Sequence, residues 1–236
     1  MTTKKIIGFG DSFVYGSEQE NNEDGSLGWP GRVANNLNCE YHTRANPGCG
    51  NDYIAQQIYS WFAQNPVEDT LAVINWTWIS RWDYYVFDHK TWITFGPTCV
   101  PERLKDLVDR TQAKEMVEFY HSRINAGILW NKLRNLQTIY AAQSYMKQKN
   151  INCIQTYMDY DMFDIPCEHK DLTPDYINEL QKLVYPELEL FEGQNFVDWS
   201  RKNGFVVSKG GMHPLENAHI AAAALWQNRY ANALGA

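Results

Sequence analysis

Short apolar runs alternate along the chain with longer segments that have helical spacing. A run without regular polar alternation is typical of a strand that is buried on both faces of a sheet. Apolar residues at three- and four-residue spacing predict the helices that lie between such strands. The predicted strands are 5–9, 39–44, 71–74 and 151–157, and the predicted helices are 29–37, about 51–62, 114–149, 174–190 and 214–234.

Two further apolar pieces, at 196–197 and 205–207, lie between the last two predicted helices. We expect one of them to supply a fifth strand. Strands that alternate with helices imply a parallel sheet with right-handed crossovers and helices on both faces. We therefore predict an α/β fold, a three-layer α/β/α sandwich around a doubly wound, mostly parallel five-stranded sheet of flavodoxin-like type.

An aromatic and irregular segment at about 76–112 interrupts this alternation. Long segments of this kind inside a domain are usually functional loops or covers. Packing is the simplest explanation for the large side chains, and a platform for stacking sugars is the alternative. With 236 residues and 44% hydrophobic content, we expect one domain over 1–236 that carries this segment as an insertion. Its large aromatic residues are Trp76, Trp78, Trp82, Tyr84, Tyr85, Phe87, Trp92 and Phe95.

Charge and cysteine content exclude several classes of partner. A net charge of -7 argues against a nucleic-acid partner, which would need a basic face. No apolar stretch is long enough to span a bilayer, and the N-terminus lacks the apolar core of a signal peptide. The five cysteines are odd in number and lack paired spacing, so they indicate neither a disulfide framework nor a zinc site. We expect a soluble cytoplasmic protein without a metal or a membrane partner; the sequence does not fix its oligomeric state.

The first predicted strand ends at Gly-Asp-Ser, 10–12. This places the Ser12 hydroxyl at the carboxyl edge of the sheet, beside N–H groups of the next helical turn, while Asp11 is expected to be structural, as a cap or loop hydrogen-bonder. The glycine-rich loop at 48–51 and His213, at the start of the last helix, can reach the same crevice. Nucleophilic acyl transfer needs a hydroxyl, a base and N–H donors for the oxyanion, and these segments supply all three.

At these positions the chain resembles the SGNH or GDSL-type hydrolases, whose members include esterases, lipases and sugar deacetylases. The resemblance spans nearly the whole chain and rests on the order of three segments. They are Gly-Asp-Ser at 10–12, Asn-Pro-Gly-Cys-Gly-Asn at 46–51 and His-Pro at 213–214. The resemblance implies that Ser12 is the nucleophile and His213 is the base.

The same resemblance implies the donors to the oxyanion. The N–H of Ser12 would donate together with that of Gly50, or of Gly48 as the alternative. The family has a third segment with an asparagine donor, and Thr77 stands at that place in the string Asn-Trp-Thr-Trp. The Thr77 hydroxyl is therefore the expected third donor.

One family position is altered beside the base. The family has an aspartate three residues before its histidine, and this chain has Gly210 there. Loss of the orienting carboxylate costs about 10⁴ in rate in a triad enzyme. Orientation of His213 would then require a backbone carbonyl or another carboxylate, such as Asp198.

The leading hypothesis is a serine esterase that hydrolyses a small ester, with a carbohydrate O-acetyl group as a candidate, and that needs no cofactor. Its partner would be a small ester or an acetylated glycan. The alternative is a non-catalytic SGNH-like module that binds glycan or protein through the aromatic segment. Compact proteins of this kind with altered motifs resemble some carried by bacterial viruses, an origin that suits both hypotheses.

Overall fold

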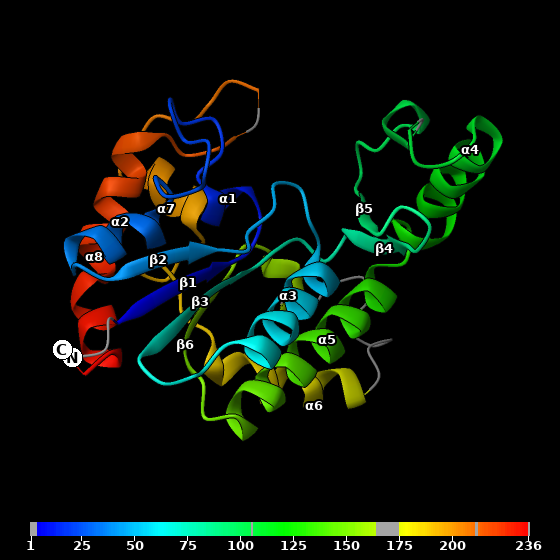
Figure 1. Cartoon of the computed structure of the whole chain (residues 1–236). Coiled ribbons are helices and arrows are strands. Elements are labelled where there is room, and N and C mark those ends of the chain that lie inside the picture. Colours follow the sequence, from blue (N-terminus) through cyan, green and yellow to red (C-terminus); the bar gives the residue numbers. More distant parts are fainter. Residues whose placement is uncertain (1–3, 105, 164–174, 211, 236) are drawn as a thin grey trace.

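The computed structural model describes residues 4–104, 106–163, 175–210 and 212–235. Its main sheet has four parallel strands in the order β2-β1-β3-β6. They are β1 (Lys5–Phe9), β2 (Glu40–Thr43), β3 (Thr70–Trp76) and β6 (Asn152–Tyr157). Helices cover both faces of this sheet (Figure 1), which confirms the predicted three-layer α/β architecture.

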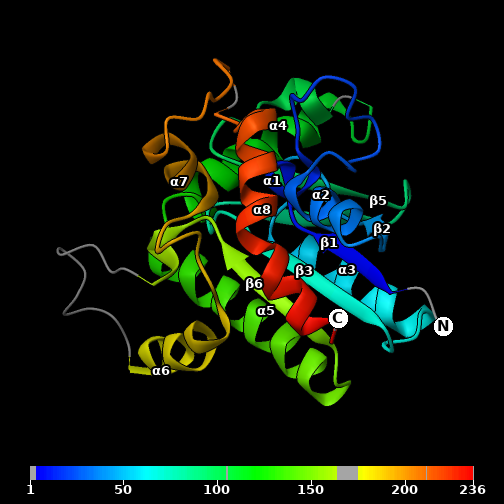
Figure 2. The same cartoon turned by 90° about the vertical axis from the view of Figure 1, so that its left-hand side faces the viewer.

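The central strand β3 is buried at every position because helices pack on both of its faces. Side chains alternate between the two faces, so Ala72 and Ile74 enter one core while Leu71 and Val73 enter the other. The first core is covered by α3 (Asn51–Gln64), α5 (Ile128–Gln148) and α6 (Asp175–Val184). The second core is covered by α2 (Trp29–Asn36), α7 (Phe196–Lys202) and α8 (Glu216–Ala233), which lie in front of the sheet in Figure 2.

The predicted fifth strand was wrong, since the sheet of the described residues has four strands. The apolar pair at 196–197 opens α7 instead, because the Asn195 side chain caps that helix by accepting from the Asp198 N–H. The second candidate, 205–207, forms only an isolated bridge between Val207 and Pro214. Neither piece reaches the sheet.

The helix predicted at 114–149 is interrupted. It consists of α4 (Arg110–Phe119), a π-helical turn η2 (Tyr120–Ile124) and α5. The Asp109 side chain starts α4 by accepting from two amides of its first turn. The helix predicted at 174–190 corresponds to α6 and the short 3-10 turn η5 (Tyr185–Glu187), and its residue 174 lies outside the described residues. Another 3-10 turn is η3 (Tyr160–Met162).

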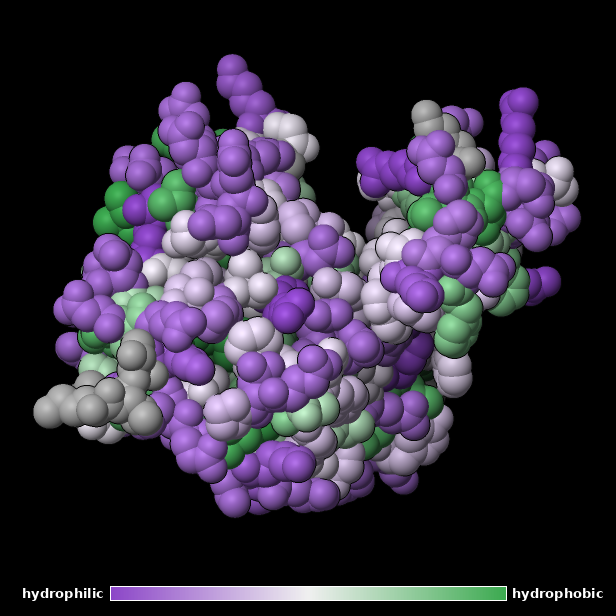
Figure 3. All heavy atoms as spheres, viewed as in Figure 1, coloured by the Kyte–Doolittle hydropathy of each residue, from purple (hydrophilic) through white to green (hydrophobic). Residues whose placement is uncertain are grey.

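Much of the predicted aromatic segment lies in a projection that we call the arm, residues 82–104 and 106–124. It contains an antiparallel hairpin of β4 (Trp82–Val86) and β5 (Thr91–Phe95), the 3-10 turn η1 (Pro101–Leu104), α4 and η2. The arm packs around its own buried cluster, which is separate from the two cores of the sheet. Figure 1 shows the arm standing away from the sheet, and Figure 3 shows the surface hollowed between the two.

The arm is joined to the body by a buried carboxylate. Asp83 of β4 accepts hydrogen bonds from the N–H groups of Gly50 and Tyr53, each at 2.8 Å, and from the Thr94 hydroxyl. The Tyr120 hydroxyl adds a bond of 2.7 Å to the Ser80 carbonyl. The base of the arm is therefore attached to the first turn of α3.

Among the helices that the structure describes, none combines the length and the apolar character needed to cross a bilayer.

Candidate active site

Ser12 lies where β1 ends, at the first position of the short helix α1 (Ser12–Tyr15). Gly10 is needed in this turn because a Cβ there would come within 2.5 Å of a Val14 methyl group. The Asp11 side chain caps α1 by accepting from the Phe13 N–H at 3.0 Å, which confirms its expected capping role. The turn thereby holds Ser12, which is only 4% exposed, at the carboxyl edge of the sheet.

The strand order creates a crevice at this edge. The chain leaves β1 toward β2 on one side and returns to β3 on the other side, so the loops that follow β1 and β3 part from each other. A cavity of about 400 Å³ lies here, and it contains both predicted catalytic residues. It is lined by Ser12, Phe13, Ser17, Glu18, Pro47, Gly48, Trp78, Arg81, Met212 and His213.

His213 is held by its backbone and by ring packing. Its N–H donates to the Ser208 hydroxyl at 3.2 Å, and the Ser208 N–H donates to its carbonyl at 2.8 Å. Its ring packs on Phe13 with 5.1 Å between the ring centroids. On the other side of the ring from Nδ1, Nε2 hydrogen-bonds to none of the described residues. That nitrogen is available to a serine hydroxyl in the same cavity.

Glu18 is the carboxylate beside His213. Its Oε1 lies 3.2 Å from His213 Nδ1, within ion-pair distance although the angle is not that of a hydrogen bond. A hydrogen bond with Ser208 and the charge of His213 lower the pKa of Glu18, although partial burial opposes them. The sequence analysis missed Glu18 because it lies in a polar loop, where no spacing pattern predicts a partner near the other end of the chain.

The candidate named from the sequence, Asp198, lies elsewhere. It accepts from the Asn195 side chain at 3.2 Å and lies 3.8 Å from Arg201. It does not line the cavity that holds His213.

Two predicted oxyanion donors are engaged by carboxylates. The Gly50 N–H donates to Asp83, and a Cβ at Gly50 would lie 2.6 Å from that carboxylate, so the glycine permits this close approach. The Thr77 hydroxyl is fully buried and donates to Asp11 Oδ2 at 2.6 Å. Neither Gly50 nor Thr77 lines the cavity, in contrast to Ser12.

The alternative donor, Gly48, does line the cavity. A Cβ at this position would meet no atom within 4 Å, so crowding does not require a glycine here. The backbone does, because its φ of +84° lies in the left-handed region that favours glycine. Among the described residues, nothing accepts a hydrogen bond from the Gly48 N–H. The Ser12 N–H lies at the first position of α1, where a helix offers no internal acceptor. These two amides are the donors that the geometry leaves free.

Arg81 is a second cavity residue that the sequence analysis missed. Its Nη1 donates to Asp11 Oδ2 at 2.7 Å, to the Cys49 carbonyl at 2.8 Å and to the Thr77 hydroxyl at 2.7 Å. Its Nη2 donates to no group in the described parts of the chain. This network ties together the turns after β1 and β3 and brings a guanidinium to the cavity wall.

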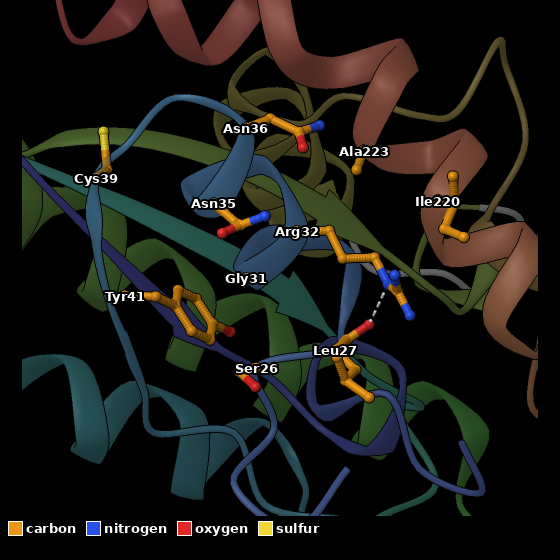
Figure 4. Close-up of a pocket in the computed structure, with 10 residues that line it drawn as sticks. All are labelled: Ser26, Leu27, Gly31, Arg32, Asn35, Asn36, Cys39, Tyr41, Ile220 and Ala223. Carbon is orange, nitrogen blue, oxygen red and sulfur yellow. Dashed lines mark hydrogen bonds between the residues drawn. The ribbon is translucent and has the colours of Figure 1, made fainter. Parts of the chain in front are cut away.

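A different cavity, of about 570 Å³, lies between α2, β2 and α8 (Figure 4). Arg32 extends across it and donates to the Leu27 carbonyl at 2.8 Å, and its Nη2 lies 3.1 Å from Glu216. Burial raises the pKa of the Cys39 thiol, which disfavours a reactive thiolate. The described residues that line this cavity include no serine–histidine pair, whereas those of the Ser12 cavity include Ser12 and His213.

Comparisons with known proteins agree with this architecture. No protein-family model matches the sequence, and no curated protein matches it. Solved structures do match. The psychrotrophic esterase EstA from Pseudoalteromonas sp. superposes with a TM-score of 0.53 at 10% identity, over 99% of this chain and 100% of that one. A Corynascus thermopiles carbohydrate esterase family 2 enzyme with a carbohydrate binding domain gives 0.52 at 14% identity, over 100% and 68%.

An acetyl xylan esterase from the rumen bacterium Butyrivibrio proteoclasticus gives a TM-score of 0.49 at 12% identity. The match covers 100% of this chain but only 65% of that longer protein. Bacterial proteins of the lipolytic G-D-S-L family are among the other matches. The two structures with TM-scores above 0.5 show that the chain has the fold of these esterases, and this agrees with the fold expected from the resemblance of its three segments to the SGNH/GDSL-type hydrolases.

Proposed function

We propose that this protein is a serine esterase that removes a small acyl group, with an acetyl group on a carbohydrate as the preferred substrate class. The observation that carries the proposal is that Ser12 and His213, from opposite ends of the chain, line one cavity at the carboxyl edge of the sheet. The fold supports it, because the superposed structures include an esterase and a carbohydrate esterase. The substrate class of those neighbours is part of what we propose for this chain.

In the first half of the reaction, Ser12 Oγ attacks the ester carbonyl carbon while His213 Nε2 takes the hydroxyl proton. The carbonyl oxygen becomes an oxyanion, and its collapse breaks the bond to the alcohol oxygen. His213 gives the proton to that leaving oxygen, which releases the alcohol and leaves an acyl-serine. In the second half, His213 takes a proton from water, the hydroxyl attacks the acyl carbon, and Ser12 recovers its proton as the acid leaves.

The oxyanion would be held by the N–H groups of Ser12 and Gly48, which both belong to cavity residues. The positive charge of Arg81 at the cavity wall would add electrostatic stabilisation. The donors that the sequence favoured, Gly50 and Thr77, would have to leave Asp83 and Asp11 before they could serve. We therefore assign the amide role to Gly48 in preference to Gly50.

The engaged donors also favour a second candidate function, a non-catalytic module that binds glycan or protein. Its binding surface would be the arm, where large aromatic side chains are exposed, Phe87 at 80% and Tyr84 at 44%. In this case the Ser12 cavity would not react with an acyl donor, while glycan would still bind.

Labelling with a fluorophosphonate probe separates the two functions. We expect the wild type to be labelled and Ser12→Ala to be unlabelled, because the probe reacts only with an activated hydroxyl. His213→Ala should lower both labelling and hydrolysis of 4-nitrophenyl acetate by about 10⁴-fold or more, since nucleophile and base act as one unit. Acetylated xylan oligosaccharides then test the substrate class.

The matched control is Ser17→Ala, because Ser17 lines the same cavity without the helix-start position of Ser12. It should keep full labelling. A folded wild type that resists the probe and hydrolyses neither substrate would overturn the esterase proposal, and binding of the oligosaccharides by that protein would establish the second function.

A further inference from the structure

We propose that Glu18 is the acid that positions His213, in place of the aspartate that is absent at position 210. The proposal rests on the proposed esterase function and identifies the third member of its catalytic group. The nucleophile and the acid would then come from one segment, 12–18, while the base comes from the other end of the chain.

The first argument is the geometry of the pair. Glu18 Oε1 lies 3.2 Å from His213 Nδ1, and the two side chains are 43% and 17% exposed. Among the described residues that line the cavity, Glu18 is the acidic one. Hydrogen bonds between catalytic groups are often poorly aligned in free enzymes and tighten when substrate binds. A contact at this distance can therefore become a full hydrogen bond from Nδ1–H.

The second argument is that one residue, Ser208, fixes both partners. Ser208 exchanges two hydrogen bonds with the His213 backbone, at 3.2 Å and 2.8 Å. It also hydrogen-bonds to the Glu18 carboxylate, and this bond contributes most to the lowered pKa of Glu18. Glu18 is thereby favoured in its ionised form at the place where an imidazolium would need a negative partner.

The third argument is backbone strain on both sides of the pair. Glu18 has a φ of +66°, and Met212, which directly precedes the base, has a φ of +58°. Residues other than glycine rarely adopt this left-handed conformation, and such backbone strain clusters at functional sites. Here the two strained residues lie on different segments and meet at one cavity.

The other charged groups near His213 do not replace Glu18. Arg81 lines the cavity but is a cation, and it is already paired with Asp11. His219 of α8 is buried and held neutral, with its pKa lowered to about 3 mainly by burial. The Glu18 carboxylate would accept a hydrogen bond from His213 Nδ1–H. This keeps the ring proton on Nδ1, so Nε2 is unprotonated and can take the proton of Ser12. The carboxylate itself stays unprotonated and stabilises the imidazolium.

The first test uses kinetics and moves the carboxylate. Glu18→Gln should lower kcat for 4-nitrophenyl acetate by at least about tenfold, within the about 10⁴-fold limit for an orienting acid, while KM changes little. Gly210→Asp should restore at least tenfold in the Glu18→Gln background. Position 210 accepts a side chain, because a Cβ there would meet no atom within 4 Å and its φ lies outside the left-handed region. Glu20→Gln, an exposed glutamate of the same loop, is the control and should leave kcat unchanged.

The second test does not depend on turnover. In the Ser12→Ala variant, ¹⁵N NMR of the His213 ring at neutral pH should show the tautomer with its proton on Nδ1. Adding Glu18→Gln should shift the ring toward the Nε2–H tautomer, since a side-chain amide can donate to Nδ1. Wild-type esterase activity with no effect of Glu18→Gln on kcat or tautomer would overturn the role of Glu18 alone. A Glu18-dependent tautomer in a protein without esterase activity would instead uphold the positioning and overturn the proposed function.

Discussion

At the scale of single residues, the Ser12 turn depends on a buried charge. Asp11 is fully buried, and its carboxylate accepts hydrogen bonds from the Phe13 N–H, the Thr77 hydroxyl and the Arg81 guanidinium. A buried carboxylate is tolerated only when it is paired and hydrogen-bonded, and removal of one partner leaves the other charge uncompensated. Asp11 thus stabilises the turn that presents Ser12.

We expect Asp11→Ala to lower the free energy of unfolding by about 3 kcal/mol, because Arg81 would lose its buried partner and α1 its cap. Urea denaturation followed by circular dichroism measures the change. Asp88→Ala, at an exposed aspartate of the arm, is the control and should stay within about 0.5 kcal/mol of the wild type. Equal effects of the two substitutions would contradict the structural importance of the Asp11 network.

The proposed catalytic residues differ in how far the sequence could predict them. Ser12 and His213 could be proposed from the sequence because they lie in short motif segments that follow one another in a recognisable order along the chain. Glu18 and Arg81 escaped because their roles come from contacts between distant parts of the chain, at 3.2 Å and 2.7 Å. The amide of Gly50 was assigned from its place in a motif, and only the structure shows Asp83 beside it.

At the scale of elements, fully apolar runs were predicted well and amphipathic ones less well. The strands β1, β3 and β6 match their predictions. Strands that are buried on both faces appear in the sequence as continuous apolar runs, and these runs are easy to recognise. The fifth strand failed because an apolar pair suits a strand or a helix equally, and the cap at Asn195 decided for the helix. The hairpin of the arm went unpredicted because its aromatic residues pack on a local cluster instead of the main sheet.

One contact between elements should control stability in acid. His219 of α8 is fully buried, and its Nδ1 accepts from the Trp29 N–H at the start of α2 at 3.0 Å. Burial is the main cause that lowers its pKa from 6.5 to about 3. A lowered histidine pKa contributes stability that is present above the unfolded value and is lost as the pH falls through 6.5 toward 3.

We therefore expect the wild type to lose several kcal/mol through His219 between pH 6.5 and pH 3, at about 1.4 kcal/mol for each pKa unit. His219→Gln keeps an acceptor for Trp29 but cannot be protonated, so its free energy of unfolding should fall less steeply over this range. Urea titrations at pH 7, 5.5 and 4.5 measure the slopes. His89→Gln, on the exposed tip of the arm hairpin, is the control and should keep the slope of the wild type. A slope in His219→Gln as steep as the slope in His89→Gln would count against the prediction.

At the scale of the whole molecule, the arm and the body have separate cores. Among the described residues, the arm's cluster shares no buried member with either core of the sheet, and Asp83 and Tyr120 join the arm to the body. Regions with few contacts to the rest of a protein open at lower free energy than its central strands. The arm should accordingly behave as a distinct unit in solution.

Hydrogen exchange followed by mass spectrometry tests this division. Amides of β4 and β5 should exchange faster than those of β1 and β3, which lie in the middle of the sheet. Asp83→Ala should raise exchange in the arm and the first turn of α3 by at least about tenfold, because the Gly50 and Tyr53 amides lose their acceptor. Thr91→Ala, a hairpin substitution away from this carboxylate, should not alter α3. A uniform rise across the sheet would show that arm and body unfold together.

The bond between Asp83 and Gly50 also joins the arm to the loop that precedes α3. The same loop contains Gly48, which lines the Ser12 cavity. A molecule that binds the arm more tightly when this bond is intact would favour one arrangement of that loop. By reciprocity, a molecule in the cavity that prefers the same arrangement would tighten binding at the arm by an equal free energy. Under the proposed esterase function, the arm would thus give this fold a physical route by which recognition of a bulky substrate adjusts the site that cleaves its ester.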